Sequence, residues 1–150
     1  MSARNLETIH RKSGYAHRIW SVSEYEILLK DPRTILVQDS YSFSIGRLVA
    51  REAELLMIAV AQEHQGKGLG RRSLKKFEEV LITKGATCCF LEVAKTNISA
   101  CTMYKAEGFD VISTRKAYYQ LGKNNRVDAL IMRKTFCLSS IDDAKIFAGQ

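Results

Sequence analysis

Three glycines alternate with larger residues in the stretch HQGKGLGRR, residues 64–72, at positions 66, 68 and 70. The apolar run LLMIAVA (55–61) precedes them, and a basic amphipathic segment follows. A strand that leads through a glycine-rich turn into a helix leaves the amides of the first helical turn unpaired, and the helix dipole favours anions there. The stretch therefore predicts a site for phosphate oxygens, to which Lys67 and Arg71 can add positive charge.

Two widespread phosphate-binding patterns do not match this stretch. The P-loop requires Gly-Lys-Ser/Thr, which does not occur in the sequence. The dinucleotide fingerprint G-x-G-x-x-G differs from the G-x-G-x-G spacing found here, and the preceding segments indicate a strand meander rather than a βαβ unit. A glycine turn that only joins a strand to a helix remains the structural alternative.

A carboxyl and a phenol further along the chain could act as general base and general acid. Glu92 lies in an otherwise apolar strand segment, with Leu91 and Val93 facing the opposite way, so its carboxylate is either functional or solvated at an edge. Tyr104 follows Asn97 by almost two helical turns, so both project from one side of a helix. Tyr104 also reads as a half-buried core tyrosine, and Asn97 as a helix cap.

The rest of the sequence predicts the elements that position these groups. The first 30 residues indicate two helices, interrupted near Ser13–Gly14, with a capping box at Ser21 and Glu24. The period then changes to that of strands, and the third strand is the least polar, which predicts burial on both of its faces. The predicted strands are 34–38, 43–50, 53–60, 87–93, 109–119 and 127–134, and the later helices run from 69 to Lys84–Gly85 and over 98–107.

Composition limits the classes of protein that this chain can belong to. Its 150 residues, 46% hydrophobic and 26% charged, fit one soluble domain over 1–150, with 138–150 as a short helix or a loose tail. No run is long enough to span a membrane and no secretory signal begins the chain, which predicts a cytoplasmic protein. The four cysteines and three histidines lack a metal-binding spacing, so no metal is expected.

The net charge of +7 invites a nucleic-acid interpretation. However, the basic residues that flank the glycines have no aromatic residues between them, as a base-stacking surface would require. The pattern favours a small phosphorylated ligand, and direct nucleic-acid binding is not expected.

The segment QGKGLG, Gln65 to Gly70, resembles the Q/R-x-x-G-x-G/A signature of the GNAT superfamily of N-acetyltransferases. The resemblance continues through LEVAKTNISACTMYKAEGF, RKAYY and DALIM, in the order and spacing of the RimI-type ribosomal-protein-alanine N-acetyltransferases. It covers residues from about 55 to 133 well and the first fifty loosely. It implies an α+β fold, the GNAT acyl-CoA N-acyltransferase fold, with a mixed, mostly antiparallel, splayed sheet flanked by helices.

The resemblance also implies the reaction and the residues that perform it. Acetyl-CoA is the implied co-substrate, and the acceptor is a protein N-terminal α-amine, such as the N-terminal alanine of a small-subunit ribosomal protein. By position, Glu92 is the implied general base and Tyr104 the general acid, and no metal is required. The implied coenzyme-binding residues are Ile58, Ala59, Val60, Gln65, Gly66, Lys67, Gly68, Leu69, Gly70, Arg71 and Asn97.

Some alternatives and departures from the family pattern remain. The acceptor could instead be a lysine side chain or a small amine, or the domain could bind acyl-CoA or nucleic acid without catalysis. Residues 1–5 are too short and polar for the first strand that the family usually has, and Gly66 replaces a common basic residue, for which Lys67 could compensate. Residues 115–119, RKAYY, either shape the acceptor groove or form an exposed strand end.

Overall fold

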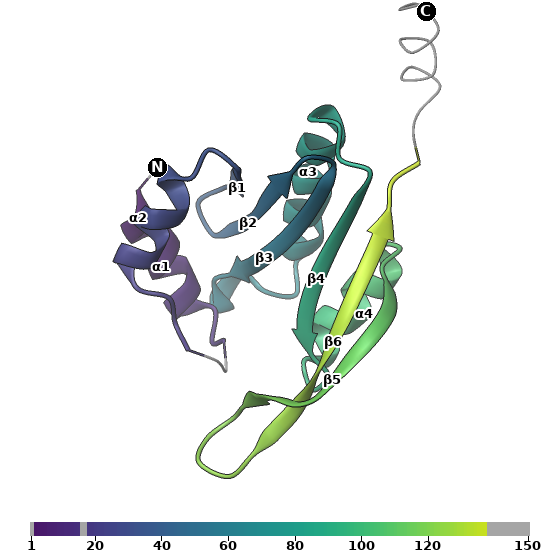
Figure 1. The fold of residues 1–150 in the computed structure, drawn as a ribbon. Helices are drawn as coiled ribbons and strands as arrows, with labels where there is room; N and C mark the ends of the chain where they lie inside the picture. The colour runs from purple at the N-terminus through teal and green to yellow at the C-terminus, as the bar shows by residue number, and fades with distance from the viewer. Residues whose placement is uncertain (1, 16–17, 138–150) are drawn as a thin grey trace, which may run out of the picture.

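The computed structural model describes residues 2–15 and 18–137, so the tail or helix predicted at 138–150 lies outside the described residues. Within the described residues, six strands form one sheet in the order β1-β2-β3-β4-β6-β5 (Figure 1). The strands are β1 (Thr34–Gln38), β2 (Ser42–Val49), β3 (Glu52–Val60), β4 (Cys88–Ala94), β5 (Asp110–Gln120) and β6 (Arg126–Thr135). The helices are α1 (Ala3–Lys12), α2 (Val22–Lys30), the short 3₁₀ helix η1 (Gln62–His64), α3 (Leu69–Thr83) and α4 (Ile98–Ala106).

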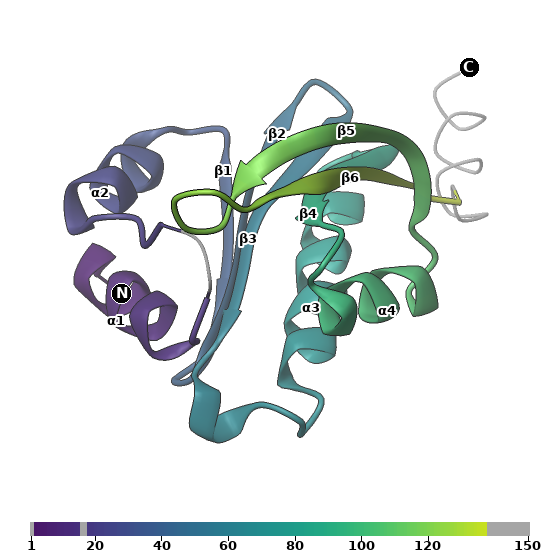
Figure 2. The same cartoon turned by 90° about the horizontal axis from the view of Figure 1, so that it is seen from below.

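Helices cover the sheet from both sides. Figure 2 shows α1 and α2 on one face and α3 and α4 on the other. Leu6, Tyr25 and Phe43 belong to the core under α1 and α2, whereas Phe77 and Leu91 belong to the core under α3 and α4. All strand pairs are antiparallel except β3 with β4. The predicted α+β fold with a mixed, mostly antiparallel sheet flanked by helices is confirmed.

Local signals in the sequence explain where the first two helices begin. The Ser21 hydroxyl accepts a hydrogen bond from the Glu24 amide, and the Glu24 carboxylate accepts one from the Ser21 amide, which completes the predicted capping box. Ser2 caps α1 with a single bond, since its hydroxyl accepts from the Asn5 amide, and no strand precedes α1 in the part of the chain that the structure describes. The edge of the sheet on this side is therefore β1.

The third strand is less buried than its sequence predicts. Its residues alternate, and Glu52 and Glu54 are exposed, so the prediction of burial on both faces is wrong for the first half of β3. The reason is that α1 and α2 cover only the second half, where Met57 and Ala59 join their core. The pairing of β2 with β3 also shifts register between Ile45 and Gly46, so that Leu56 of β3 has no partner. Because of this shift, the buried residues before and after Leu56 point to opposite faces of the sheet.

The sheet divides between its two central strands. The parallel pairing of β3 with β4 runs from Glu52↔Cys88 to Leu55↔Leu91 and ends there. Beyond that point β3 continues to Val60 and β4 to Ala94 without pairing to each other. The predicted splay of the sheet is thus located between Leu55 and Leu91.

Candidate active site

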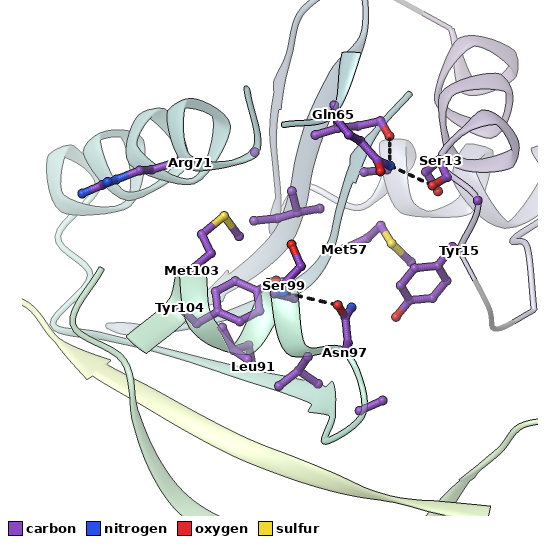
Figure 3. A pocket seen from close by; sticks show the side chains of 18 of the residues that line it. Ser13, Tyr15, Met57, Gln65, Arg71, Leu91, Asn97, Ser99, Met103 and Tyr104 are labelled. Atoms are coloured by element: carbon purple, nitrogen blue, oxygen red, sulfur yellow. Dashed lines mark hydrogen bonds between the residues drawn. The ribbon is translucent and has the colours of Figure 1, made fainter. Parts of the chain in front are cut away.

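A cleft of about 590 Å³ opens where β3 and β4 separate (Figure 3). Its lining comes from the second half of β3, the turn before α3, the end of β4, one side of α4, and the segment after α1. Segments far apart in the sequence therefore meet around a single space, as an active site requires.

The glycine turn forms one end of the cleft. Gly66 and Gly68 have φ values of 74° and 80°, in the left-handed region that glycine adopts without strain. Gly68 is the N-cap of α3 and supplies no side-chain cap, and the first bond of the helix runs from the Arg72 amide to the Gly68 carbonyl, at 3.0 Å. The amides of Leu69 to Arg71 therefore have no acceptor within the helix, which suits an anion.

The space beside the glycine turn is also free of protein atoms at two positions. A Cβ atom built at Gly66 or Gly68 would meet nothing within 4 Å, so no protein group fills the volume beside the turn. At Gly70 the φ angle is ordinary and a Cβ atom would make normal contacts with Met103 and Val60, at 3.5 and 3.6 Å. The turn thus offers bare backbone to a ligand at its first two glycines.

The polar and basic residues around the turn differ in what they do. The Gln65 side-chain amide donates to the carbonyl oxygens of Ser13, at 2.8 Å, and Val60, at 2.9 Å, so it ties the turn to neighbouring segments. Arg71 pairs with Glu107, and its side chain extends away from the other labelled side chains in Figure 3. Lys67 is exposed and does not line the cleft, whereas every other residue of the predicted site does.

Glu92 faces away from the core, as its sequence pattern predicts. Its neighbours Leu91 and Val93 are buried against α3 and α4, while its own side chain is 28% exposed and lines the cleft. Arg115 Nη1 lies 3.3 Å from Glu92 Oε1. The carboxylate is therefore reachable by a molecule that enters the cleft, beside a fixed positive charge.

Tyr104 and Asn97 line the cleft from α4 (Figure 3). Asn97 caps this helix, because its side-chain oxygen accepts a hydrogen bond from the Ala100 amide at 3.2 Å. Tyr104 is 8% exposed and its ring packs edge-on against Phe109. Burial raises the pKa of the Tyr104 phenol well above its usual range, so the hydroxyl keeps its proton.

Further residues, whose role the sequence pattern does not indicate, complete the cleft. Ser13 and Tyr15 approach from the segment after α1, Ser99 and Met103 from α4, and Leu121 from the end of β5. Met103 follows Ser99 by four residues, about one helical turn, so helical spacing from Ser99 could have indicated it. Tyr15 reaches the cleft through long-range packing, for which a local pattern gives no signal.

The RKAYY segment adjoins the cleft through Glu92 and does not itself line it. Its first residue, Arg115, contacts Glu92, and Tyr119 is half-buried. Burial, followed by the nearby groups Tyr15 and Glu92, raises the pKa of Tyr119.

Among the described residues no three Asp, Glu, His or Cys side chains gather as a metal site would require.

Comparison with known proteins identifies the family to which this architecture belongs. The family model of the acetyltransferase (GNAT) family matches residues 34–109. The chain belongs to this family. The match begins at β1 and ends after α4, so it includes the glycine turn, Glu92 and Tyr104.

Three relatives illustrate how similar other members are. Over 91 residues the chain is 36% identical to the [ribosomal protein bS18]-alanine N-acetyltransferase of Salmonella typhimurium, and the match spans 61% of each chain. It is 33% identical over 90 residues to the N-alpha-acetyltransferase RimI of Mycobacterium tuberculosis, covering 60% of this chain and 53% of that protein. The crystal structure of the Escherichia coli ribosomal-protein-S18-alanine N-acetyltransferase superposes with a TM-score of 0.81 at 26% identity, over 92% of this chain and 90% of that one.

These similarities confirm the GNAT fold and the resemblance to RimI-type enzymes. The chain matches less than two thirds of the length of the curated relatives, 61% for the Salmonella protein. Within the described residues no helix is long and apolar enough to cross a membrane.

Proposed function

We propose that this protein is an N-acetyltransferase that moves the acetyl group of acetyl-CoA to the α-amine of a protein N-terminus. The observation that carries the proposal is the end of β3–β4 pairing at Leu55↔Leu91, beyond which a cleft lies between a bare glycine turn and the side chains of Glu92 and Tyr104. An anion site, a carboxylate and a protonated phenol around one space are the groups that acyl transfer to an amine needs.

The glycine turn would hold the phosphates of the coenzyme. The amides of Leu69, Gly70 and Arg71 have no acceptor within α3, the space beside Gly66 and Gly68 is open, and the helix dipole adds a favourable potential. The residues of β3 from Ile58 to Val60 line the cleft and have no β4 partner, so their main-chain groups on that edge are available to the pantetheine arm, except the Val60 carbonyl, which accepts from Gln65. Arg71 would contribute through its amide, since its guanidinium is paired with Glu107.

The reaction divides the proton transfers between two side chains. Glu92 accepts the proton that the acceptor nitrogen loses as this nitrogen bonds to the thioester carbon. As the carbon–sulfur bond breaks, Tyr104 donates its proton to the leaving thiolate. Burial raises the pKa of Tyr104, so the phenol still carries its proton when the thiolate leaves.

An N-terminal amine is the acceptor that this site fits best. A free α-amino group has a pKa of about 7.7 to 8.0, whereas that of a lysine side chain is about 10.4, so a single carboxylate base suffices for the former. The relatives named for alanine N-acetylation of ribosomal protein bS18 support an N-terminal alanine of a ribosomal protein as the finer proposal.

An acetyl-transfer assay tests this proposal. The protein is incubated with labelled acetyl-CoA and one class of acceptor in each reaction. The three classes are peptides that begin with alanine, peptides whose only amine is a lysine side chain, and free polyamines. Mass spectrometry should locate the acetyl group on the terminal nitrogen of the first set. Transfer that is fastest to polyamines would instead assign a small-molecule acceptor, and no transfer to any amine would remove the proposal.

A further inference from the structure

An ion pair joins the two helices that line the cleft. Arg71, in the first turn of α3, pairs with the carboxylate of Glu107, the C-cap residue of α4. The partners differ in exposure, since 57% of the Arg71 side chain but only 7% of the Glu107 side chain is exposed. A buried charge costs free energy unless it is paired, and Arg71 provides this partner.

The same helices also approach each other at the residue before Arg71. A Cβ atom built at Gly70 would lie 3.5 Å from Met103 Sδ, so α4 passes close to the backbone of α3 there (Figure 3). Met103 and Glu107 are four residues apart and therefore lie on one side of the end of α4. Gly70 and Arg71 thus both contact α4, and their amides belong to the unpaired set at the glycine turn.

The place of Glu107 is set by the way in which α4 ends. The amide of Gly108, whose φ is 94°, donates to the carbonyl of Lys105 at 3.1 Å. The Phe109 amide donates to the carbonyl of Tyr104 at 2.9 Å. These two bonds form a Schellman motif, which fixes the last residues of the helix. Glu107 is therefore held three residues from the proposed acid, Tyr104.

A second ion pair connects this region to the sheet. Lys134 Nζ of β6 lies 2.8 Å from Glu78 Oε2 on α3. Burial is the main cause that raises the pKa of Glu78, and the charge of Glu107 acts in the same direction. The two carboxylates are thus close enough to repel each other, and each has a cation of its own, Lys134 or Arg71. Four charged side chains therefore connect α3, α4 and β6.

We propose that Glu107 is a positioning residue that, through Arg71, holds the glycine turn in the geometry that binds the diphosphate of the coenzyme. The inference rests on the proposed N-acetyltransferase function. Glu107 does not line the cleft, so it acts through Arg71, whose amide is one of the unpaired amides at the turn. Without Glu107 the exposed guanidinium turns to water, and the first turn of α3 loses this contact with α4. Donors held in place bind better than donors that must be ordered on binding.

Titration calorimetry with CoA tests the proposal without turnover. Glu107→Gln keeps the size of the side chain and removes its charge, and we expect the Kd of CoA to rise about tenfold. Glu79→Gln is the matched control, because it removes an exposed carboxylate of α3 outside the cleft and should leave the Kd unchanged. Salt at about 0.15 M screens charges beyond about 8 Å and limits long-range effects.

The sign of the change decides between two roles of Arg71. If its guanidinium were itself a phosphate ligand, Glu107 would compete with the coenzyme for it, and Glu107→Gln would bind CoA more tightly. Tighter binding would therefore overturn the proposal. Arg71→Gln should weaken binding as Glu107→Gln does, and the double variant should be no weaker, because both changes remove one contact. The double variant also avoids the unpaired buried carboxylate that Arg71→Gln leaves.

A donor without phosphates separates positioning from general damage. S-acetylpantetheine carries the thioester but no diphosphate, so Glu107→Gln should keep the wild-type kcat/KM for this donor while losing about tenfold with acetyl-CoA. An equal loss with both donors would mean that Glu107 supports the fold and not the phosphate site. Thermal denaturation checks that each variant is folded.

This inference and the proposed function can fail separately. A wild-type protein that binds no CoA removes both of them. If the wild-type protein binds CoA and transfers acetyl, while Glu107→Gln matches Glu79→Gln in Kd and in kcat/KM, only the role of Glu107 is removed.

Discussion

The side-chain amide of Gln65 donates a hydrogen bond to the main-chain oxygen of Ser13 at 2.8 Å, across 52 positions of the sequence. The same nitrogen donates to the carbonyl of Val60, at the end of β3. One side chain thus connects the segment after α1, the central strand and the glycine turn. The segment after α1 and the end of β3, which both line the cleft, are therefore held to the glycine turn by the same side chain.

Removing this connection should loosen the glycine turn. For Gln65→Leu we expect a loss of about 1 kcal/mol in the free energy of unfolding, because a hydrogen-bonded contact is lost, and a raised KM for acetyl-CoA. Urea denaturation and steady-state kinetics measure the two effects. Glu63→Gln, at an exposed position of η1, is the control and should change neither. An unchanged KM in Gln65→Leu would show that the turn holds its shape alone.

Glu92→Gln should abolish most of the activity without affecting the fold. A general base contributes at least about 100-fold to the rate, so we expect kcat to fall by that factor while the KM for acetyl-CoA stays the same. Glu54→Gln provides the comparison, since Glu54 is an exposed carboxylate of β3 outside this cleft. Equal kcat values for the two variants would exclude Glu92 as the base.

Tyr104→Phe removes the proposed acid while keeping the ring in the core. We expect kcat to fall about 10- to 100-fold, because the leaving thiolate must then take its proton from water. Since burial raises the pKa of Tyr104, the wild-type rate should not decline between pH 9 and 10, where an ordinary tyrosine begins to ionise. Rate profiles over this range test the assignment, and a Tyr104→Phe rate equal to the wild-type rate would contradict it.

Ala117 should be replaceable with a gain in stability. At φ 51°, glycine avoids the clash of an alanine Cβ, so we expect Ala117→Gly to raise the free energy of unfolding by about 0.5 to 1 kcal/mol. The same change at Ala106, in the last turn of α4, should lower it by a similar amount. Urea denaturation of both variants measures the difference. A loss of stability in Ala117→Gly would mean that the backbone of β5 at Ala117 is not strained.

Stability should decline in mild acid because of His10. This side chain is fully buried, its Nδ1 lies 2.8 Å from the Tyr25 hydroxyl, and burial lowers its pKa below the usual 6.5. The unfolded chain therefore binds a proton more readily, so the free energy of unfolding should be highest above pH 6.5 and fall as the pH drops below it. Urea denaturation at pH 5 and 7 tests this, and NMR titration of the His10 ring should show a midpoint below 6.5. A midpoint above 6.5 would reverse the sign.

Much of the architecture is readable from local patterns. Alternating apolar residues predict β1 over the same residues, 34–38, and the boundaries of the other strands to within about a residue. Ser21 and Glu24 predict the start of α2, because a capping box satisfies amides within four residues. The orientation of Glu92 follows from the two-residue period of a strand.

Other features depend on contacts between distant segments, which periodicity does not encode. Nothing around Ala117 predicts its left-handed backbone conformation. The pairing of β5 with β6 is irregular there, and the Ala117 amide donates to Asp128 on the neighbouring strand. The salt bridge that engages the Arg71 guanidinium depends on Glu107, at the end of another helix. Similarly, the exposure of Glu52 and Glu54 follows from where α1 and α2 pack, which the sequence of β3 does not specify.

The interruption of pairing after Leu55 and Leu91 gives the sheet a passage from one side to the other. The glycine turn and Tyr104 belong to the layer of α3 and α4, whereas Glu92 and Arg115 stand on the reverse side of β4. Under the proposed function, acetyl-CoA and the acceptor would therefore enter from opposite directions and occupy the site together. Direct transfer within that ternary complex would need no covalent acetyl-enzyme, and substitutions near Glu92 would change the choice of acceptor while the glycine turn stays as it is.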